Sequence, residues 1–320
     1  MSYVNYFHFD APPFPAAGPN NYFFGERRRM AAASDIVARI RVSPGIYAVI
    51  GSAGVGKTVL LKSVWRELRN NDWTVFISAS ERTDILRAMA DVLMPDSRRK
   101  TTPDVFPALE KVYRKGQNVV VLIDDADGLS AAAKVCLASL ISAVPYIRVV
   151  LSGGRGLKKL LADRKFPAMR GRMVAVYRIR HLPYFSAVRY INDISVAALS
   201  LSQYKKVIPV SSALAIAFAA NRSMRSINVI ATAAIEDAWR SGVRRVGLGS
   251  VLRAVRAHWG IARENIYQKF KKIFAYLLAL LSLYYVVKIF ADRKELIQAI
   301  EVRQSIEEQE KSFEGMTLGS

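Results

Sequence analysis

The chain has 320 residues, 52% of them hydrophobic and 23% charged, a composition that excludes collagenous and disordered classes of protein. Forty-seven Lys and Arg residues against 26 Asp and Glu residues give a net charge of +21, which predicts a polyanionic neighbour: nucleic acid, acidic lipid headgroups or bound nucleotide. The single cysteine, Cys136, excludes an intramolecular disulfide, and with three scattered histidines it excludes the usual zinc spacings.

The sequence of the first 182 residues predicts a lead-in segment followed by an α/β domain. Residues 1–30 are rich in aromatics and proline, and we expect this lead-in to pack on the domain that follows. From 31 to 182, apolar β-rich runs alternate with helical patterns, which is typical of a parallel sheet with helices on both faces. The expected strands are 46–50, 73–78, 118–123, 147–152 and 173–179. Residues 183–262 show helical patterns, and we expect a small all-α domain there.

A phosphate-binding motif follows the first expected strand. The sequence GSAGVGKT matches G-x-x-x-x-G-K-[ST] between a strand and a helix, the context that this motif requires. Its glycines let backbone N–H groups cradle phosphates at a helix N-terminus. We expect Lys57 to reach the β- and γ-phosphates and the Thr58 hydroxyl to bind Mg²⁺. The expected nucleotide-binding residues here are Gly51, Ser52, Ala53, Gly54, Val55, Gly56, Lys57 and Thr58.

A pair of carboxylates follows the expected strand at 118–123. Asp124 and Asp125 emerge at its carboxyl end, the edge at which open α/β sheets bind ligands. We expect Asp124 to hold the hydration shell of Mg²⁺, and Asp125 to orient or deprotonate the attacking water. The alternative for Asp125 is a solvated turn residue. Because the sequence lacks the N-K-x-D guanine signature, ATP is favoured over GTP.

With these motifs, the chain from about residue 6 to about residue 239 resembles the AAA+ ATPases of the ExeA type. These include general secretion pathway protein A and MshM of pilus biogenesis, and more distantly the TniB-like transposition ATPases. Pro13–Phe14 and the sequence YFFGE are similar to the family's lead-in, whose aromatic cluster lies near the adenine. The resemblance therefore implies contacts from Phe24 and Gly25, a P-loop AAA+ fold with a helical lid over 183–262, and an oligomer that shares its sites.

The resemblance implies further site residues where this chain departs from the family's pattern. The fourth expected strand is followed by GGRGL instead of Gly-Gln-Pro-Glu-Leu, so the usual polar sensor is missing and Ser152 is the substitute candidate. Arg172 fits the arginine that points into a neighbouring subunit's site, with Arg170 second and a solvated arginine as the alternative. Arg225 is similar to the sensor-2 arginine, which reaches the γ-phosphate from the lid. Asp125 replaces the family's Glu with a side chain one methylene shorter, which predicts slow or partner-dependent hydrolysis.

The C-terminal region contains an apolar run whose location decides where the protein works. Ile273–Val287 is 15 residues without a charge, about 22 Å as a helix, and snorkelling of Lys288 extends the run to residue 291. We expect a single transmembrane helix over 273–291; the alternative is a buried helix of the lid. Residues 1–291 carry 43 basic and 19 acidic residues, and the short acidic tail at 292–320 carries 4 and 7. The positive-inside rule then predicts a single-pass protein of the inner membrane with its ATPase domain in the cytoplasm.

These features together predict a membrane-anchored AAA+ ATPase that uses ATP and Mg²⁺ to drive assembly of an envelope complex, of the secretion or pilus-like kind. Its expected partners are further copies of itself, membrane proteins of that complex, and acidic lipid headgroups beside the basic residues preceding the span. Two alternatives stay open. One is an ATP-dependent DNA-binding regulator of the transposition type, and the other is a weakly hydrolysing nucleotide-dependent scaffold.

Overall fold

The structure is a computed structural model, and it describes residues 2–15, 24–79, 84–94, 105–199 and 206–258. The expected transmembrane helix and the acidic tail lie outside these residues. Within the part of the chain that is described, none of the helices combines the length and the hydrophobicity that a membrane crossing requires.

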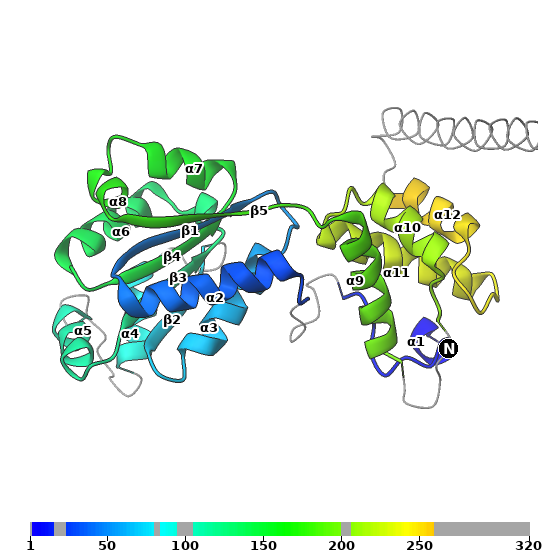
Figure 1. The fold of residues 1–320 in the computed structure, drawn as a ribbon, viewed down its shortest axis with the longest axis horizontal. Helices are drawn as coiled ribbons and strands as arrows, with labels where there is room; N and C mark the ends of the chain where they lie inside the picture. The colour runs from blue at the N-terminus through cyan, green and yellow to red at the C-terminus, as the bar shows by residue number, and fades with distance from the viewer. Residues whose placement is uncertain (1, 16–23, 80–83, 95–104, 200–205, 259–320) are drawn as a thin grey trace, which may run out of the picture. The chain divides into compact units, whose positions relative to one another are not determined.

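The α/β domain is built on one sheet of five parallel strands in the order β2-β3-β4-β1-β5 (Figure 1). The five expected strands are confirmed, each to within one residue at either end. They are β1 (Gly45–Gly51), β2 (Trp73–Ser78), β3 (Val119–Asp124), β4 (Arg148–Gly153) and β5 (Met173–Ile179). Since all five strands run in one direction, their carboxyl ends and the loops that follow β1, β3 and β4 meet at one edge of the sheet.

Helices cover both faces of this sheet, as expected for buried parallel strands (Figure 1). The helices of this domain are α2 (Arg27–Val42), α3 (Lys57–Leu68), α4 (Ile85–Leu93), α5 (Val105–Arg114), α6 (Ala131–Ala143), α7 (Arg155–Ala162) and α8 (Pro167–Gly171), with the short 3-10 turn η2 (Ala126–Gly128). Strand β3 contributes to a separate core on each face of the sheet, because its alternate side chains point to opposite faces. Val120 and Leu122 join the core beneath α2 and α3, whereas Val119, Val121 and Ile123 join the core beneath α4–α8.

Polar N-cap residues precede several of these helices. Asp84 caps α4 by accepting a hydrogen bond from the Arg87 N–H at 3.0 Å. Ser130 caps α6 in the same way, accepting from the Ala133 N–H at 3.1 Å. Such caps satisfy N–H groups that have no partner within the helix, so the polar residue before each apolar run is what sets the helix start.

A second group of helices forms the all-α lid. Its members are α9 (Tyr184–Ala197), α10 (Val210–Ala219), α11 (Met224–Arg240) and α12 (Leu248–His258). The lid has an apolar core of its own, centred on the buried face of α11. These described helices lie inside 183–262, the range in which the sequence predicts helical structure.

The lead-in packs differently from our expectation. The four aromatic side chains Phe7, Phe9, Phe14 and Phe24 are buried in the core of the lid, not against the sheet. A short helix, α1 (Tyr3–Tyr6), begins this segment, and the Thr232 hydroxyl of α11 donates a hydrogen bond to the Phe14 carbonyl at 2.9 Å. The aromatic residues thus complete a small helical core that four helices alone would leave partly exposed.

Candidate nucleotide site

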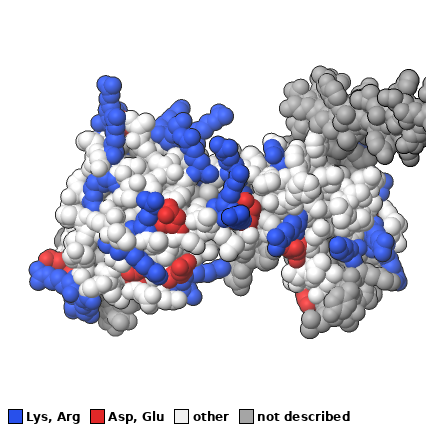
Figure 2. Space-filling view, viewed as in Figure 1, with Lys and Arg blue, Asp and Glu red and all other residues white. Residues whose placement is uncertain are grey.

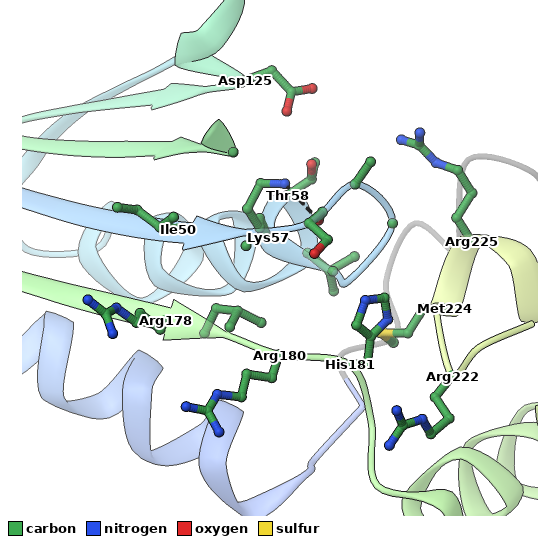
Figure 3. A pocket seen from close by; sticks show the side chains of 18 of the residues that line it. Ile50, Lys57, Thr58, Asp125, Arg178, Arg180, His181, Arg222, Met224 and Arg225 are labelled. Atoms are coloured by element: carbon green, nitrogen blue, oxygen red, sulfur yellow. Dashed lines mark hydrogen bonds between the residues drawn. The ribbon is translucent and has the colours of Figure 1, made fainter. Parts of the chain in front are cut away.

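The loop after β1, here called the P-loop (residues 51–58), has a backbone that only glycine adopts readily. Gly54 and Gly56 have φ values of +74° and +93°, in the left-handed region. Gly56 is also the N-cap of α3, so the loop opens directly onto the N-terminus of that helix. The buried Lys57 donates a hydrogen bond from Nζ to the Ser52 carbonyl at 3.1 Å (Figure 3). This backbone is suited to present its N–H groups and the helix dipole to an anion.

A pocket of about 1300 Å³ opens over the P-loop and extends to the lid. Its lining is strongly basic, with Asp125 and Asp127 as the acidic members. The basic members are Arg28, Lys57, Lys62, Arg66, Arg155, Lys158, Arg178, Arg180, Arg222 and Arg225. Such a lining concentrates positive potential where a polyphosphate would lie, and the volume is ample for a nucleotide.

The two carboxylates after β3 have different surroundings. Asp124 is buried, and its Oδ1 accepts a hydrogen bond from the Ser152 hydroxyl at the end of β4. Asp125 lines the pocket, and its carboxylate projects into it (Figure 3). Burial and the neighbouring Asp124 raise the pKa of Asp125, while Lys57 and Arg225 act in the opposite direction. A raised pKa suits a carboxylate that must take a proton from water.

The expected Mg²⁺ ligands are hard oxygen donors. Thr58 lines the pocket, and Asp124 is buried with its Oδ1 bonded to the Ser152 hydroxyl. Mg²⁺ prefers oxygen ligands and retains several waters, so this donor set fits the ion. Thr58 would bind the ion directly and Asp124 through its waters, and the ion would neutralise charge on the β- and γ-phosphates.

Of the two expected adenine contacts, Phe24 lies behind the pocket-lining Tyr190, and Gly25 is exposed. Phe24 is buried, and its ring packs edge-on against Tyr190 with 5.4 Å between the ring centroids. Tyr190 itself lines the pocket, whereas neither Phe24 nor Gly25 does. The Tyr190 hydroxyl donates to Asn228 Oδ1 at 2.8 Å, and both residues come from the lid. Among the described residues, the lid therefore contributes Tyr190 and Asn228 to the lining of the pocket.

The lid contacts the P-loop directly through the start of α11. The Arg225 N–H donates to the Gly54 carbonyl at 3.2 Å, and the Ser223 hydroxyl donates to the same oxygen at 3.4 Å. The Arg225 side chain lines the pocket, with its guanidinium on the side of Asp125 (Figure 3). The structure thus brings Arg225 together with Lys57 and Asp125 in one pocket.

Arg172 and Arg170 lie outside this pocket. The Arg172 guanidinium donates to four backbone carbonyls at the end of α6 and in the loop before β4, those of Ile141, Val144, Pro145 and Ile147. Burial lowers the pKa of Arg172. Arg170 is exposed on α8. A role for either arginine in a neighbouring subunit's site stays a prediction, and the bonds of Arg172 leave Arg170 the freer of the two.

Two residues of the site were missed by the sequence reasoning, Arg29 and Asp127. Arg29 is buried in α2; its Nη1 donates to the Val55 carbonyl and lies 3.1 Å from the Met224 sulfur, and its Nη2 donates to the Arg180 carbonyl at 3.1 Å. It therefore joins the P-loop, the end of β5 and the lid. A signal existed, because Arg29 falls on the apolar face of α2 at helical spacing from Ala33 and Ile36. Asp127 holds the loop after β4, as described below.

Comparisons with known proteins agree with this geometry. A family profile described as "AAA domain" matches residues 40–161, which include the P-loop and both carboxylates. No curated protein sequence matches the chain.

Among solved structures, Cdc6p from Pyrobaculum aerophilum is 18% identical with a TM-score of 0.59, covering 74% of this chain and 69% of that one. The ADP form of the Aeropyrum pernix ORC2 protein is 15% identical with a TM-score of 0.60, covering 78% and 73%. The Aeropyrum pernix ORC1 protein, solved in complex with DNA, is 17% identical with a TM-score of 0.56, covering 75% and 66%.

Identities this low show the fold and leave the activity open. The parallel sheet, the P-loop at its carboxyl edge, the helical lid and the matched AAA domain together identify the fold. The chain has the P-loop fold of the AAA+ ATPases.

Proposed function

We propose that this protein is an ATP-binding and ATP-hydrolysing switch. The observation that carries the proposal is the meeting of Lys57, Asp125 and Arg225 in one pocket over the P-loop. In the reaction, a water molecule attacks the γ-phosphorus and gives its proton to Asp125. The bond to the β–γ bridging oxygen breaks, and ADP and inorganic phosphate leave. Because the lid contributes Arg225, the state of the nucleotide would set the position of the lid.

Binding of labelled ATP to the Lys57→Ala variant tests this site. The variant removes the buried ammonium group and is expected to lose measurable binding, whereas Lys111→Ala, on α5 away from the pocket, is expected to bind like the wild type. Retention of similar affinity by Lys57→Ala would show that the nucleotide site is misassigned.

The proposal extends to a membrane anchor and an envelope role. The apolar run at 273–291, the change of charge across it and the resemblance to ExeA-type ATPases support a single-pass inner-membrane protein that drives assembly of an envelope complex. Self-association and contacts with membrane proteins of that complex are part of this proposal, and acidic headgroups would face the basic residues that precede the span.

Membrane fractionation tests the anchor. The full chain is compared with a chain that ends at Arg263, which retains the compact unit of residues 1–258. Each is washed with high salt and then with alkaline carbonate. We expect only the full chain to resist both washes. A full chain that washes off or stays soluble would contradict the anchor and favour the second candidate function.

The second candidate is an ATP-dependent DNA-binding regulator, and a cationic surface favours it. Figure 2 shows Lys and Arg side chains projecting from the edge of the α/β domain that carries α7 and α8. We call this the α7–α8 basic surface: Arg155, Lys158, Lys159, Arg164, Lys165 and Arg170, all exposed. No ion pair joins any of them to another described residue, and no large apolar side chain is exposed between 155 and 171. Positive charge without stacking or inserting groups suits a duplex phosphate backbone.

Binding of duplex DNA at a series of salt concentrations tests this candidate. Affinity is expected to fall linearly on logarithmic axes, with a slope of about −0.9 for each phosphate neutralised. The double variant Lys159→Glu/Lys165→Glu should weaken binding, while Lys111→Glu/Lys115→Glu, with the same change of charge on another surface, should not. Equal loss in both pairs would show that net charge alone, and not this surface, attracts DNA.

A further inference from the structure

We infer that Asp127 is a positioning residue for Asp125, and that the glycine-rich loop after β4 is shaped to hold its carboxylate. This inference rests on the proposed ATP hydrolysis and concerns how the same site is set. The acidic loop, residues 124–128, carries Asp125 in a short turn between β3 and α6. Catalysis requires that this turn be held in one conformation, because a general base tolerates little displacement.

Asp125 reaches the pocket by an unusual backbone. Its φ and ψ are +49° and +44°, in the left-handed region, which aspartate adopts more readily than most residues but still sparsely. The side chain is short, so its direction is set mainly by the backbone. A left-handed residue persists only where the surrounding structure holds it, which points to neighbours that fix the turn.

Ser152 provides the first hold, on the amino side of the turn. Its hydroxyl oxygen accepts a hydrogen bond from the Asp125 N–H at 3.3 Å, while the same hydroxyl donates to Asp124. Ser152 is fully buried at the end of β4, so its position is fixed by the sheet. The end of β4 therefore fixes the start of the acidic loop.

Asp127 provides the second hold, two residues further along. One oxygen of its carboxylate accepts a hydrogen bond from the Gly154 N–H, and the other accepts from the Leu157 N–H. Both donors belong to the start of α7, whose N-cap Gly154 has no side chain to cap the helix. A carboxylate at a helix N-terminus is further favoured by the helix dipole. Asp127 thus fastens the acidic loop to the start of α7 by two hydrogen bonds, two residues after Asp125.

The glycines of the loop after β4 make room for this carboxylate. A Cβ added at Gly156 would lie 2.6 Å from Asp127 Oδ1, and one added at Gly153 or Gly154 would lie 3.1 or 3.2 Å from Oδ2. None of the three positions therefore accepts a side chain without displacing Asp127 or crowding it. The departure from the family's Gly-Gln-Pro-Glu-Leu pattern has a physical reason here, because the bare backbone of GGRGL receives Asp127.

A purely structural role for Asp127, as a cap for α7, predicts loss of stability alone. A positioning role predicts a loss of turnover that depends on the length of the side chain at 125. In the wild type the turn is set for the short carboxylate, so Asp125→Glu should lower kcat. With Asp127 removed the turn is loosened, and the longer side chain should then recover part of the lost rate.

The experiment is a double-mutant cycle on the full chain, with variants Asp127→Ala, Asp125→Glu and both together, measured by single-turnover hydrolysis of MgATP and by MgATP affinity. We expect Asp127→Ala to lower the hydrolysis rate up to about 100-fold with little change in affinity, since the P-loop is untouched. The double variant should be faster than Asp127→Ala.

The matched control is Asp84→Ala, which removes an aspartate cap from α4, away from the pocket. It should lower the melting temperature to a similar extent and leave the hydrolysis rate unchanged. Wild-type rate in Asp127→Ala, or equal effects of Asp125→Glu in both backgrounds, would overturn the inference while leaving the ATPase intact. A wild type that neither binds nor hydrolyses MgATP would instead overturn the proposed function, and the inference with it.

Discussion

At the scale of single residues, the ionisation of Asp125 determines the acid limit of the proposed hydrolysis. Burial and Asp124 raise the pKa of this carboxyl group. Only the ionised form accepts a proton, so kcat/KM should fall as the pH drops through a pKa above the ordinary aspartate value of about 3.9. The pH profile of kcat/KM for MgATP checks this. An acid limb at the ordinary value, or an unchanged limb in Asp125→Asn, would contradict it.

Among the residues of this site, Arg29 is the one whose replacement should destabilise the described domain most. Its guanidinium is buried, burial lowers its pKa, and it donates to carbonyls of both the P-loop and the end of β5. Lysine keeps the charge but has no planar fork to reach both carbonyls. Arg29→Lys should therefore lower the free energy of unfolding by about 3 kcal/mol, measured by urea denaturation. Arg28→Lys, at the exposed position beside it, should change little; equal losses would show that the buried fork is unimportant.

At the scale of elements, the contact between α11 and the P-loop should couple the lid to the nucleotide. A Cβ added at Gly54 would lie 2.6 Å from the Ser223 hydroxyl and 2.8 Å from the Arg225 Cβ. Gly54→Ala should therefore displace the start of α11 and weaken ATP binding.

Gly116→Ala is the matched control for this variant, since Gly116 also has a positive φ, of +80°, but open space around it. In both variants, alanine in a left-handed conformation lowers stability by about 1 kcal/mol. Hydrogen exchange in α11 and ATP affinity should change in Gly54→Ala alone. Parallel changes in the two variants would mean that backbone strain, and not the lid contact, is responsible.

At the scale of the whole molecule, the proposed oligomer requires a residue that acts in a neighbour's site. Arg170 is exposed, whereas the Arg172 guanidinium binds four carbonyls of its own chain. We therefore expect Arg172→Ala to lower stability, and Arg170→Ala to lower hydrolysis with unchanged stability and ATP affinity.

Mixing two inactive variants tests this directly. Lys57→Ala lacks the nucleotide site and Arg170→Ala lacks the trans-acting group, so mixed oligomers should contain some complete sites and recover activity. Absence of recovery in mixtures that co-elute as oligomers would argue against Arg170 as the shared residue.

The sequence by itself determined the strands, the P-loop and the two carboxylates. These features depend on short-range chemistry. Runs such as VVVLID are typical of strands buried on both faces, and glycines followed by a lysine at a helix start are typical of phosphate-binding loops. Arg225 was reached by resemblance, and the structure brings it to the pocket. The membrane span and the partners are still predictions from sequence.

Only the tertiary structure decided which distant segments meet. The lead-in aromatics complete the lid core, Arg172 binds backbone carbonyls, Arg29 joins the P-loop to the lid, and Asp127 fits the glycines after β4. Each of these contacts joins residues far apart in the chain, and the partners are often backbone groups that have no sequence signature. Periodicity and motif spacing report local structure, so they do not specify which N–H or carbonyl a buried side chain will find.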